Sequence, residues 1–479
     1  MSPIYYSSGL VTNRLHIAAL IEKKINEANA LTSLYNEGGF AFNLNTFATP
    51  VEGVRLLPVS HDVVVSPGSI AIQQVLDLGG SERLSPDEYW DLIDRGAREI
   101  IENVTAIVDH GLPVFSDITG GRDSRLVFGA LVAAGRQRDV IFNTIANPTT
   151  PGLEADLEIG TGLVKRYGGS YARPSEVVGY SNFSVEQHLA RRRSQVFGTY
   201  HWIVPSDVRP LSVLTSNMSI RLLGGGGECY DDRFRDMVFT TVDIRDKYTQ
   251  DRVRGMLDHH QGKGATRQFY DLYVDDLLET FNHLPGSTVT DRINAHYLNF
   301  RNRFHFGPKQ SSPESMSGIN PAMSINLIRA ARGLPAHERS TGRVVFDTIR
   351  AMDEELAFLP FDSPSDARII ESPYFRPSRF RFGDLDLEPA RDIVLGDTRP
   401  KLAQQAIKPI VEVPDFTSVL DNEISQSIDT IRSGNSPFKA LMNEGMDDHI
   451  VWAKTFSPVQ RAALASKVRS FADFSQTIE

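Results

Sequence analysis

Residues 114–125, with the sequence VFSDITGGRDSR, have the residue types and spacing best suited to chemistry. An apolar run ends in Asp117, a turn containing Gly120 and Gly121 follows, and Asp123 opens an apolar-periodic stretch. This order predicts a strand, a glycine turn and a helix N-terminus, where backbone N–H groups and the helix dipole can hold a phosphate-like anion. An acidic residue beside a phosphate site indicates a place for Mg²⁺.

A second glycine-rich turn, residues 224–227, follows another strand candidate at 220–223 and leads into Glu228. Ligands of a doubly wound sheet bind beyond the carboxyl ends of its strands, so we expect both turns to meet at one site. There Asp123 and Glu228 would suit Mg²⁺ bound to pyrophosphate. Either turn alone would be an ordinary connection, and Glu228 a solvated side chain. Their order and their places at strand ends favour a site.

The surrounding sequence predicts the elements that must position these turns. Ser85, Pro86 and Glu88 form a capping-box signature for a helix expected to end near Gly111. Further helices are predicted at 124–134 and 153–167, and strands at 113–115, 140–144 and 220–223. This alternation predicts an α/β fold, a doubly wound parallel sheet with added helices. Residues 51–65 indicate β structure around a turn, so a small β-rich N-terminal part is expected.

Composition limits the class of protein. The chain has 479 residues, 41% hydrophobic and 23% charged, which is ordinary for a globular protein. A net charge of -10 without an acidic tail argues against a nucleic-acid binder and offers no membrane-surface patch. Cys229 is the one cysteine, no apolar run approaches the ~18 residues of a membrane span, and the first residues lack signal-peptide features. We therefore expect a cytoplasmic protein with neither nucleic-acid nor membrane partners.

Several segments together resemble one family. TGGRDS (119–124) resembles the SGGxDS pyrophosphate loop of the asparagine synthetase-like family, within the adenine nucleotide α-hydrolase (PP-loop ATP pyrophosphatase) group. LLGGGGEC (222–229) resembles its second loop, and ADLEIGTGLVKRYG (155–168) resembles the helix after its second strand. Residues 319–339 and 353–362 resemble later helices, and 397–414 the segment with a catalytic lysine. The resemblance spans residues 86–415, extends to lasso-peptide cyclases and other amide-forming synthetases, and implies a PP-loop, HUP-like sheet.

Members of this family adenylate a carboxylate with ATP, release pyrophosphate and pass the acyl group to an amine. The resemblance therefore implies ATP and Mg²⁺ as cofactors, and a carboxylate and an amine acceptor, small molecule or peptide, as substrates. Asp123 and Glu228 would ligate Mg²⁺. The implied nucleotide-binding set is Ile118, Thr119, Gly120, Gly121, Asp123, Ser124, Thr144, Gly226 and Gly227.

Lys401 falls at the position of the family's catalytic lysine, with Lys408 as the alternative. It would place positive charge on developing phosphoryl or acyl oxyanion charge, and Asp123 completes the implied catalytic pair. The second loop departs from the family, with Glu228 where Asp is usual and Cys229 where Glu is usual. One acid is retained, so metal ligation is still expected. Cys229 is expected to be a small buried side chain, because no base partner can be named for it.

The N-terminus departs further, because glutamine-dependent members begin with a catalytic cysteine and a complete glutaminase domain. We expect residues 1–84 to be a truncated, glutaminase-like remnant and residues 85–479 to be the synthetase domain with a helical C-terminal part. The amine would then come from a second substrate, from the same molecule or through a separate partner protein. Two other interpretations stay open: a degenerate, non-catalytic member acting as partner or scaffold, and a PP-loop enzyme of sulfur transfer or tRNA modification.

Overall fold

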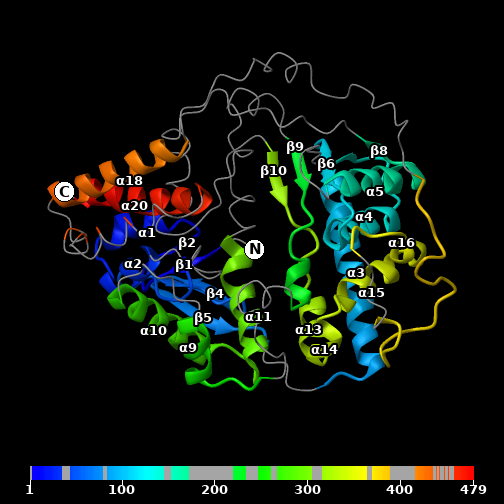
Figure 1. Ribbon diagram of the computed structural model, residues 1–479, viewed down its shortest axis with the longest axis horizontal. Coiled ribbons are helices and arrows are strands. Elements are labelled where there is room, and N and C mark those ends of the chain that lie inside the picture. The colour runs from blue at the N-terminus through cyan, green and yellow to red at the C-terminus, as the bar shows by residue number, and fades with distance from the viewer. Residues whose placement is uncertain are drawn as a thin grey trace, which may run out of the picture.

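A computed structural model describes most of the chain. The described residues are 3–34, 44–78, 83–144, 153–171, 219–232, 246–259, 267–304, 316–363, 369–388, 416–434, 439, 442, 447, 451 and 458–478. In Figure 1, the sheet that contains β6 and β9 and the helices packed on it lie on the right of the view. The N-terminal elements lie on the left, together with the C-terminal helices α18 and α20. Among the described residues, no helix is both long and apolar enough to cross a bilayer.

The strands are β1 (Tyr5–Tyr6), β2 (Val11–Thr12), β3 (Arg55–Leu56), β4 (His61–Ser66), β5 (Ser69–Gln74), β6 (Val114–Asp117), β7 (Ile141–Asn143), β8 (Ser170–Tyr171), β9 (Ser219–Leu222) and β10 (Met316–Ile319). The helices are α1 (Leu15–Glu22), α2 (Glu27–Leu34), α3 (Pro86–Asp109), α4 (Arg122–Ala133), α5 (Leu153–Arg166), α9 (Gln250–His259), α10 (Arg267–His283), α11 (Val289–Asn299), α13 (Ile325–Gly333), α14 (Ala336–Arg339), α15 (Arg343–Met352), α16 (Glu354–Phe358), α18 (Phe416–Ser433) and α20 (Pro458–Ile478). A 3-10 turn, η2 (Gly227–Tyr230), follows β9.

Five parallel strands form the central sheet in the order β10-β9-β6-β7-β8. Successive strands β6, β7 and β8 advance one way, whereas β9 and β10 lie on the other side of β6. The winding therefore reverses between β6 and β9, where Ser116 lies opposite Leu222. Open α/β sheets bind ligands in the crevice at such a reversal. The predicted α/β class with a parallel sheet is confirmed.

Local sequence signals place the helices next to this crevice. The capping box of α3 forms as predicted: the Glu88 N–H donates to Ser85 Oγ at 3.3 Å, and the Ser85 N–H donates to the Glu88 carboxylate at 2.9 Å. The helix ends at Asp109, just before Gly111, whose φ of 83° suits glycine. The α4 helix begins at Arg122, two residues earlier than predicted, so the second half of the TGGRDS motif belongs to its first turn.

A buried arginine fixes a distant segment onto α4. The Arg125 side chain has no exposed surface, donates from NH1 to the Leu359 carbonyl at 2.8 Å and from NH2 to the Pro360 carbonyl, and lies over the Phe361 ring. Burial lowers the pKa of Arg125 to about 9, against the raising effect of Asp362, so the guanidinium stays charged at neutral pH. These bonds hold residues 359–362 beside the first glycine turn.

The N-terminal segment does not build a core of its own. Its strands β1, β2 and β3 are two residues long, and α1 and α2 lie between β2 and β3, so the β-rich expectation holds only in part. Tyr5, Leu15 and Leu56 share one hydrophobic core with Phe300 and with the C-terminal helices α18 and α20. The N-terminal segment therefore buries its apolar residues together with the C-terminal helices, because such short strands bury too little surface to close a core alone.

Replacing Arg125 with Met is expected to lower the free energy of unfolding by about 3 kcal/mol or more. The Leu359 and Pro360 carbonyls would each lose a charged donor inside the protein, at about 1–3 kcal/mol each. Urea denaturation measures the change. The control is Arg136→Met, which breaks only partly exposed surface pairs with Asp109 and Asp139 and should cost about 1 kcal/mol or less. Equal stabilities of the two variants would show that the hydrogen bonds from Arg125 to the Leu359 and Pro360 carbonyls do not stabilise the protein.

Candidate functional site

The turn after β6 and the turn after β9 lie directly against each other. A Cβ atom on Gly224 would lie 2.8 Å from the backbone N of Ser124 and 2.9 Å from its Cα. A Cβ atom on Gly227 would overlap the Oδ1 atom of Asp123. Glycine at these positions allows the second turn to touch the N-terminus of α4. The structure thus brings together the two turns that were predicted to meet.

Side chains of the protein already accept hydrogen bonds from the first turn. The Thr119 N–H donates to Ser124 Oγ at 3.1 Å, and the Gly121 N–H donates to Thr119 Oγ1 at 3.1 Å. The Gly120 N–H donates to Asp156 Oδ1, from α5, at 2.8 Å. A carboxylate oxygen on a backbone N–H makes the same type of contact as a phosphate oxygen. The turn therefore binds an anion, and that anion is the protein's own Asp156.

A second acid, Asp362, lies beside the same glycine: a Cβ atom on Gly120 would lie 2.8 Å from the Asp362 Cβ and 3.2 Å from Asp156 Oδ1. Its backbone N–H donates to the Gly120 carbonyl at 3.0 Å, and the segment that contains it is held by Arg125. Partial burial raises the pKa of Asp156, the hydrogen bond from Gly120 opposes this, and the Asp362 charge adds to it. Neither Asp156 nor Asp362 was assigned to the site from the sequence, because no local signal links either residue to Gly120.

Asp123 and Glu228, the two predicted metal ligands, both lie at the second glycine turn. Asp123 lies against Gly227, and Glu228 Oε2 accepts a hydrogen bond from the Gly226 N–H at 3.4 Å. Burial raises the pKa of the Tyr297 hydroxyl, and the charges of both Glu228 and Asp123 add to the effect. Mg²⁺ commonly takes one or two carboxylates plus substrate phosphates, so these residues fit it. Within the described ranges, no group of three or more His, Cys, Asp or Glu side chains could hold a metal ion.

Buried polar contacts anchor the second turn. Asp232, just after η2, accepts hydrogen bonds from Arg339 Nε at 2.6 Å and from Asn294 Nδ2 at 2.5 Å. Cys229 is half-buried, not fully buried as predicted. Its burial and the neighbouring Glu228 charge raise the pKa of the thiol well above its ordinary value. The thiol is therefore protonated at neutral pH, which agrees with a side chain that is not a nucleophile.

The strand ends complete the floor of the crevice. Arg221 of β9 donates to Asp117 of β6 through Nε at 3.0 Å and NH2 at 2.8 Å, across the winding reversal. Ile118 and Thr144 are buried, and the Thr144 hydroxyl donates to the Ile118 carbonyl. Any contact of these two residues with an adenine ring would therefore come from backbone groups. The Asp117–Arg221 pair was missed because it depends on which strands are neighbours.

Lys401 and its alternative Lys408 lie outside the residues that the structure describes. The other residues of the predicted site lie after the carboxyl ends of β6, β7 and β9. Ile118 to Gly121, Thr144 and Gly226 are in the connections that follow these strands, Asp123 and Ser124 are in the first turn of α4, and Gly227 and Glu228 are in η2. A scan against models of known protein families found no match, and no curated protein is significantly similar to this chain. The function of the site must therefore be argued from its own residues.

Replacing Gly224 with Ala is expected to lower the free energy of unfolding by about 1–3 kcal/mol, because the added methyl group meets backbone atoms of Ser124 that cannot rotate away. Thermal or urea denaturation measures it. Gly255→Ala is the matched control: it lies inside α9 with nothing near its Cβ position, and should stabilise the protein by about 0.5–1 kcal/mol. A neutral Gly224→Ala substitution would show that the turns are farther apart.

Replacing Asp156 with Ala is expected to tighten the binding of pyrophosphate about tenfold at pH 7, because the Gly120 N–H loses its internal acceptor. Isothermal titration calorimetry with Mg²⁺ present measures the affinity. Glu158→Ala removes an equal charge from an exposed position on the same helix and should leave the affinity nearly unchanged. Weaker binding by the Asp156 variant would mean that this carboxylate supports the ligand instead of competing with it.

Proposed function

We propose that this chain is an ATP- and Mg²⁺-dependent ligase that forms amide bonds, of the asparagine synthetase-like group, on a PP-loop, HUP-like sheet. The main support is the contact between Asp123 on the first turn and Gly227 on the second, at the winding reversal of the sheet. That contact places an anion-binding turn and the two acids Asp123 and Glu228 around one crevice. The proposal includes a cytoplasmic setting without nucleic-acid or membrane partners.

The proposed reaction has two steps. A carboxylate oxygen of the first substrate attacks the α-phosphorus of ATP, and the bond from that phosphorus to the bridging oxygen breaks as pyrophosphate leaves. An amine then attacks the acyl carbon, AMP leaves with the electron pair of the broken bond, and the amine proton passes to solvent. Mg²⁺ would offset phosphate charge as pyrophosphate departs.

Different residues of this chain would bind the pyrophosphate, hold the metal and stabilise the developing charge. The N–H groups of Gly120, Gly121 and the first turn of α4 would bind the pyrophosphate, with Asp156 released from the turn. Asp123 and Glu228 would hold the metal. Lys401 would stabilise the negative charge that develops during transfer. Acceptors in this proposal are small molecules or peptides, and a separate partner protein could supply ammonia or a substrate.

Two other functions make different demands on the same site. A non-catalytic scaffold is favoured by Cys229 in place of a second acid and by Asp156 on the anion-binding turn. Sulfur transfer or tRNA modification needs a reactive thiol or a basic surface. The raised pKa of the Cys229 thiol and the net charge of -10 both count against it.

Replacing Asp123 with Ala is expected to reduce pyrophosphate release by about 100-fold or more, because a ligand of the metal and part of the transition-state charge balance are lost. The assay supplies ATP, Mg²⁺ and a panel of carboxylates, and identifies the nucleotide product. AMP is expected. Formation of ADP and phosphate would overturn adenylation.

Asp91→Ala is the control for this experiment, since Asp91 is exposed on α3 and forms a surface salt bridge with Arg95. It should keep full activity. Calorimetry separates the scaffold alternative from the ligase: wild-type protein that binds no ATP in the presence of Mg²⁺ would favour the scaffold. A folded Asp123→Ala variant with normal turnover would show that the first turn is not the pyrophosphate site.

A further inference from the structure

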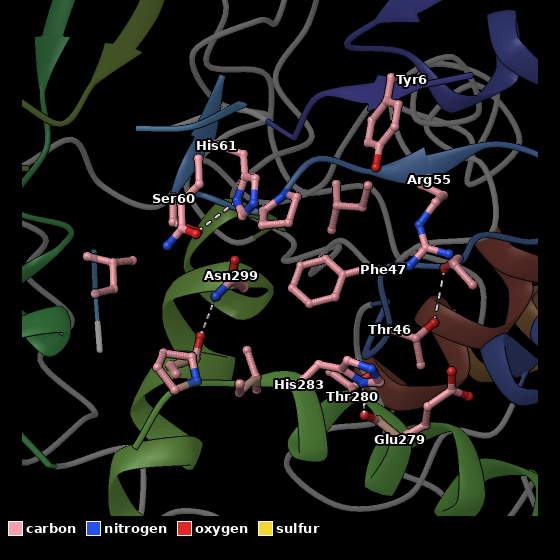
Figure 2. Close-up of a pocket in the computed structure, with 18 of the residues that line it drawn as sticks. Tyr6, Thr46, Phe47, Arg55, Ser60, His61, Glu279, Thr280, His283 and Asn299 are labelled. Atoms are coloured by element: carbon pink, nitrogen blue, oxygen red, sulfur yellow. Dashed lines mark hydrogen bonds between the residues drawn. The ribbon is translucent and has the colours of Figure 1, made fainter. Parts of the chain in front are cut away.

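A cavity of about 660 Å³ lies apart from the glycine turns, between the N-terminal strands and helices α10 and α11 (Figure 2). Its apolar wall includes Phe47, Leu56 and Leu78, of which Leu56 and Leu78 are buried. The volume lies within the range of about 300–1,000 Å³ that small-molecule sites occupy. None of the residues proposed for nucleotide or metal binding lines it.

One wall of the cavity has two carboxylates without a cationic partner. Asp276 Oδ2 accepts hydrogen bonds from Asn29 Nδ2 at 2.7 Å and Thr32 Oγ1 at 2.8 Å, so the carboxylate is held in place. Its pKa is raised by burial, and the nearby Glu279 charge adds to the effect. In the part of the chain that the structure describes, neither Asp276 nor Glu279 forms a salt bridge. An ammonium group in the cavity would supply the missing charge.

The positively charged side chain of Arg55 lines the cavity on the side of the N-terminal strands. Figure 2 shows Arg55 entering from the strands, and Glu279, Thr280 and His283 entering from α10. Among the described residues, the Arg55 guanidinium has no salt bridge or hydrogen bond. An arginine with all its donors available is the side chain best suited to a carboxylate, which it can bind through two parallel hydrogen bonds.

We propose that this cavity binds a short peptide with free ends, its ammonium group at Asp276 and Glu279 and its carboxylate at Arg55. A zwitterionic ligand brings an ammonium group to the two carboxylates and a carboxylate to Arg55, whereas a simple anion or cation would match only one of the two signs of charge. The half-buried ring of Phe47 would contact the side chains of the peptide, with Leu56 and Leu78 packed behind the wall.

Helix α11 separates this cavity from the candidate nucleotide site. Ala295 and Asn299 line the cavity, while Asn294 bonds to Asp232 and Tyr297 lies within the influence of the Asp123 and Glu228 charges. The peptide site goes beyond the proposed ligase activity and does not depend on it. Its test therefore needs no nucleotide.

The experiment incubates the full chain with a library of tripeptides that have free ends, and detects retained peptides by affinity selection and mass spectrometry. The retained peptides are then compared with their N-acetylated and C-amidated copies by calorimetry. We expect each blocked end to weaken binding at least tenfold. Glu279→Gln and Asp276→Asn should each cost a similar factor for the free peptide and little for the acetylated one. Arg55→Gln should show the same pattern with the amidated peptide.

The matched control is Asp275→Asn, since Asp275 is next to Asp276 on α10 but pairs with Arg254 at the surface and does not line the cavity. It should bind like the wild type. Exposed Glu279 and Arg55 keep the test valid should Asp276→Asn fold poorly. Retention of no tripeptide, equal binding of blocked and free peptides, or equal losses in Asp275→Asn and Glu279→Gln would each overturn the proposal.

Discussion

The contact between the second glycine turn and the N-terminus of α4 is the constraint on which the rest of the site depends. Backbone meets backbone there, because a Cβ on Gly224 would come within 2.8 Å of the Ser124 nitrogen. This approach occurs where β9 pairs directly with β6 and the winding of the sheet reverses. The same pairing places Arg221 against Asp117 and closes the crevice between the two strand ends.

Four acidic side chains lie around this crevice. Asp123 and Glu228 lie on its two turns, and Asp156 and Asp362 flank Gly120. So many acids beside an anion-binding turn suit a ligand that brings its own cation, as a nucleotide with Mg²⁺ does. The Asp156 carboxylate accepts the hydrogen bond of the Gly120 N–H. An incoming phosphate must displace this carboxylate to bind the same N–H group.

Residues near both ends of the described chain share one hydrophobic core. The N-terminal strands and helices complete their core with Phe300 and the C-terminal helices, so the two ends of the described chain depend on each other for burial. Helix α11 lies between the two candidate binding sites, with the cavity at Ala295 and Asn299 and the second turn at Asn294. Its position gives one rigid element a role in shaping both.

The sequence by itself determined what depends on neighbouring residues. The capping box at Ser85, the glycine turn before α4 and the alternation of strands and helices follow from local spacing, and all appear in the fold. Only the tertiary structure decided that Asp156 and Asp362 would meet Gly120, that the N-terminal segment would share its core with α18 and α20, and that Arg55 and Asp276 would line one cavity. These contacts join residues far apart in the chain, and burial of apolar surface, which carries no local signature, brings them together.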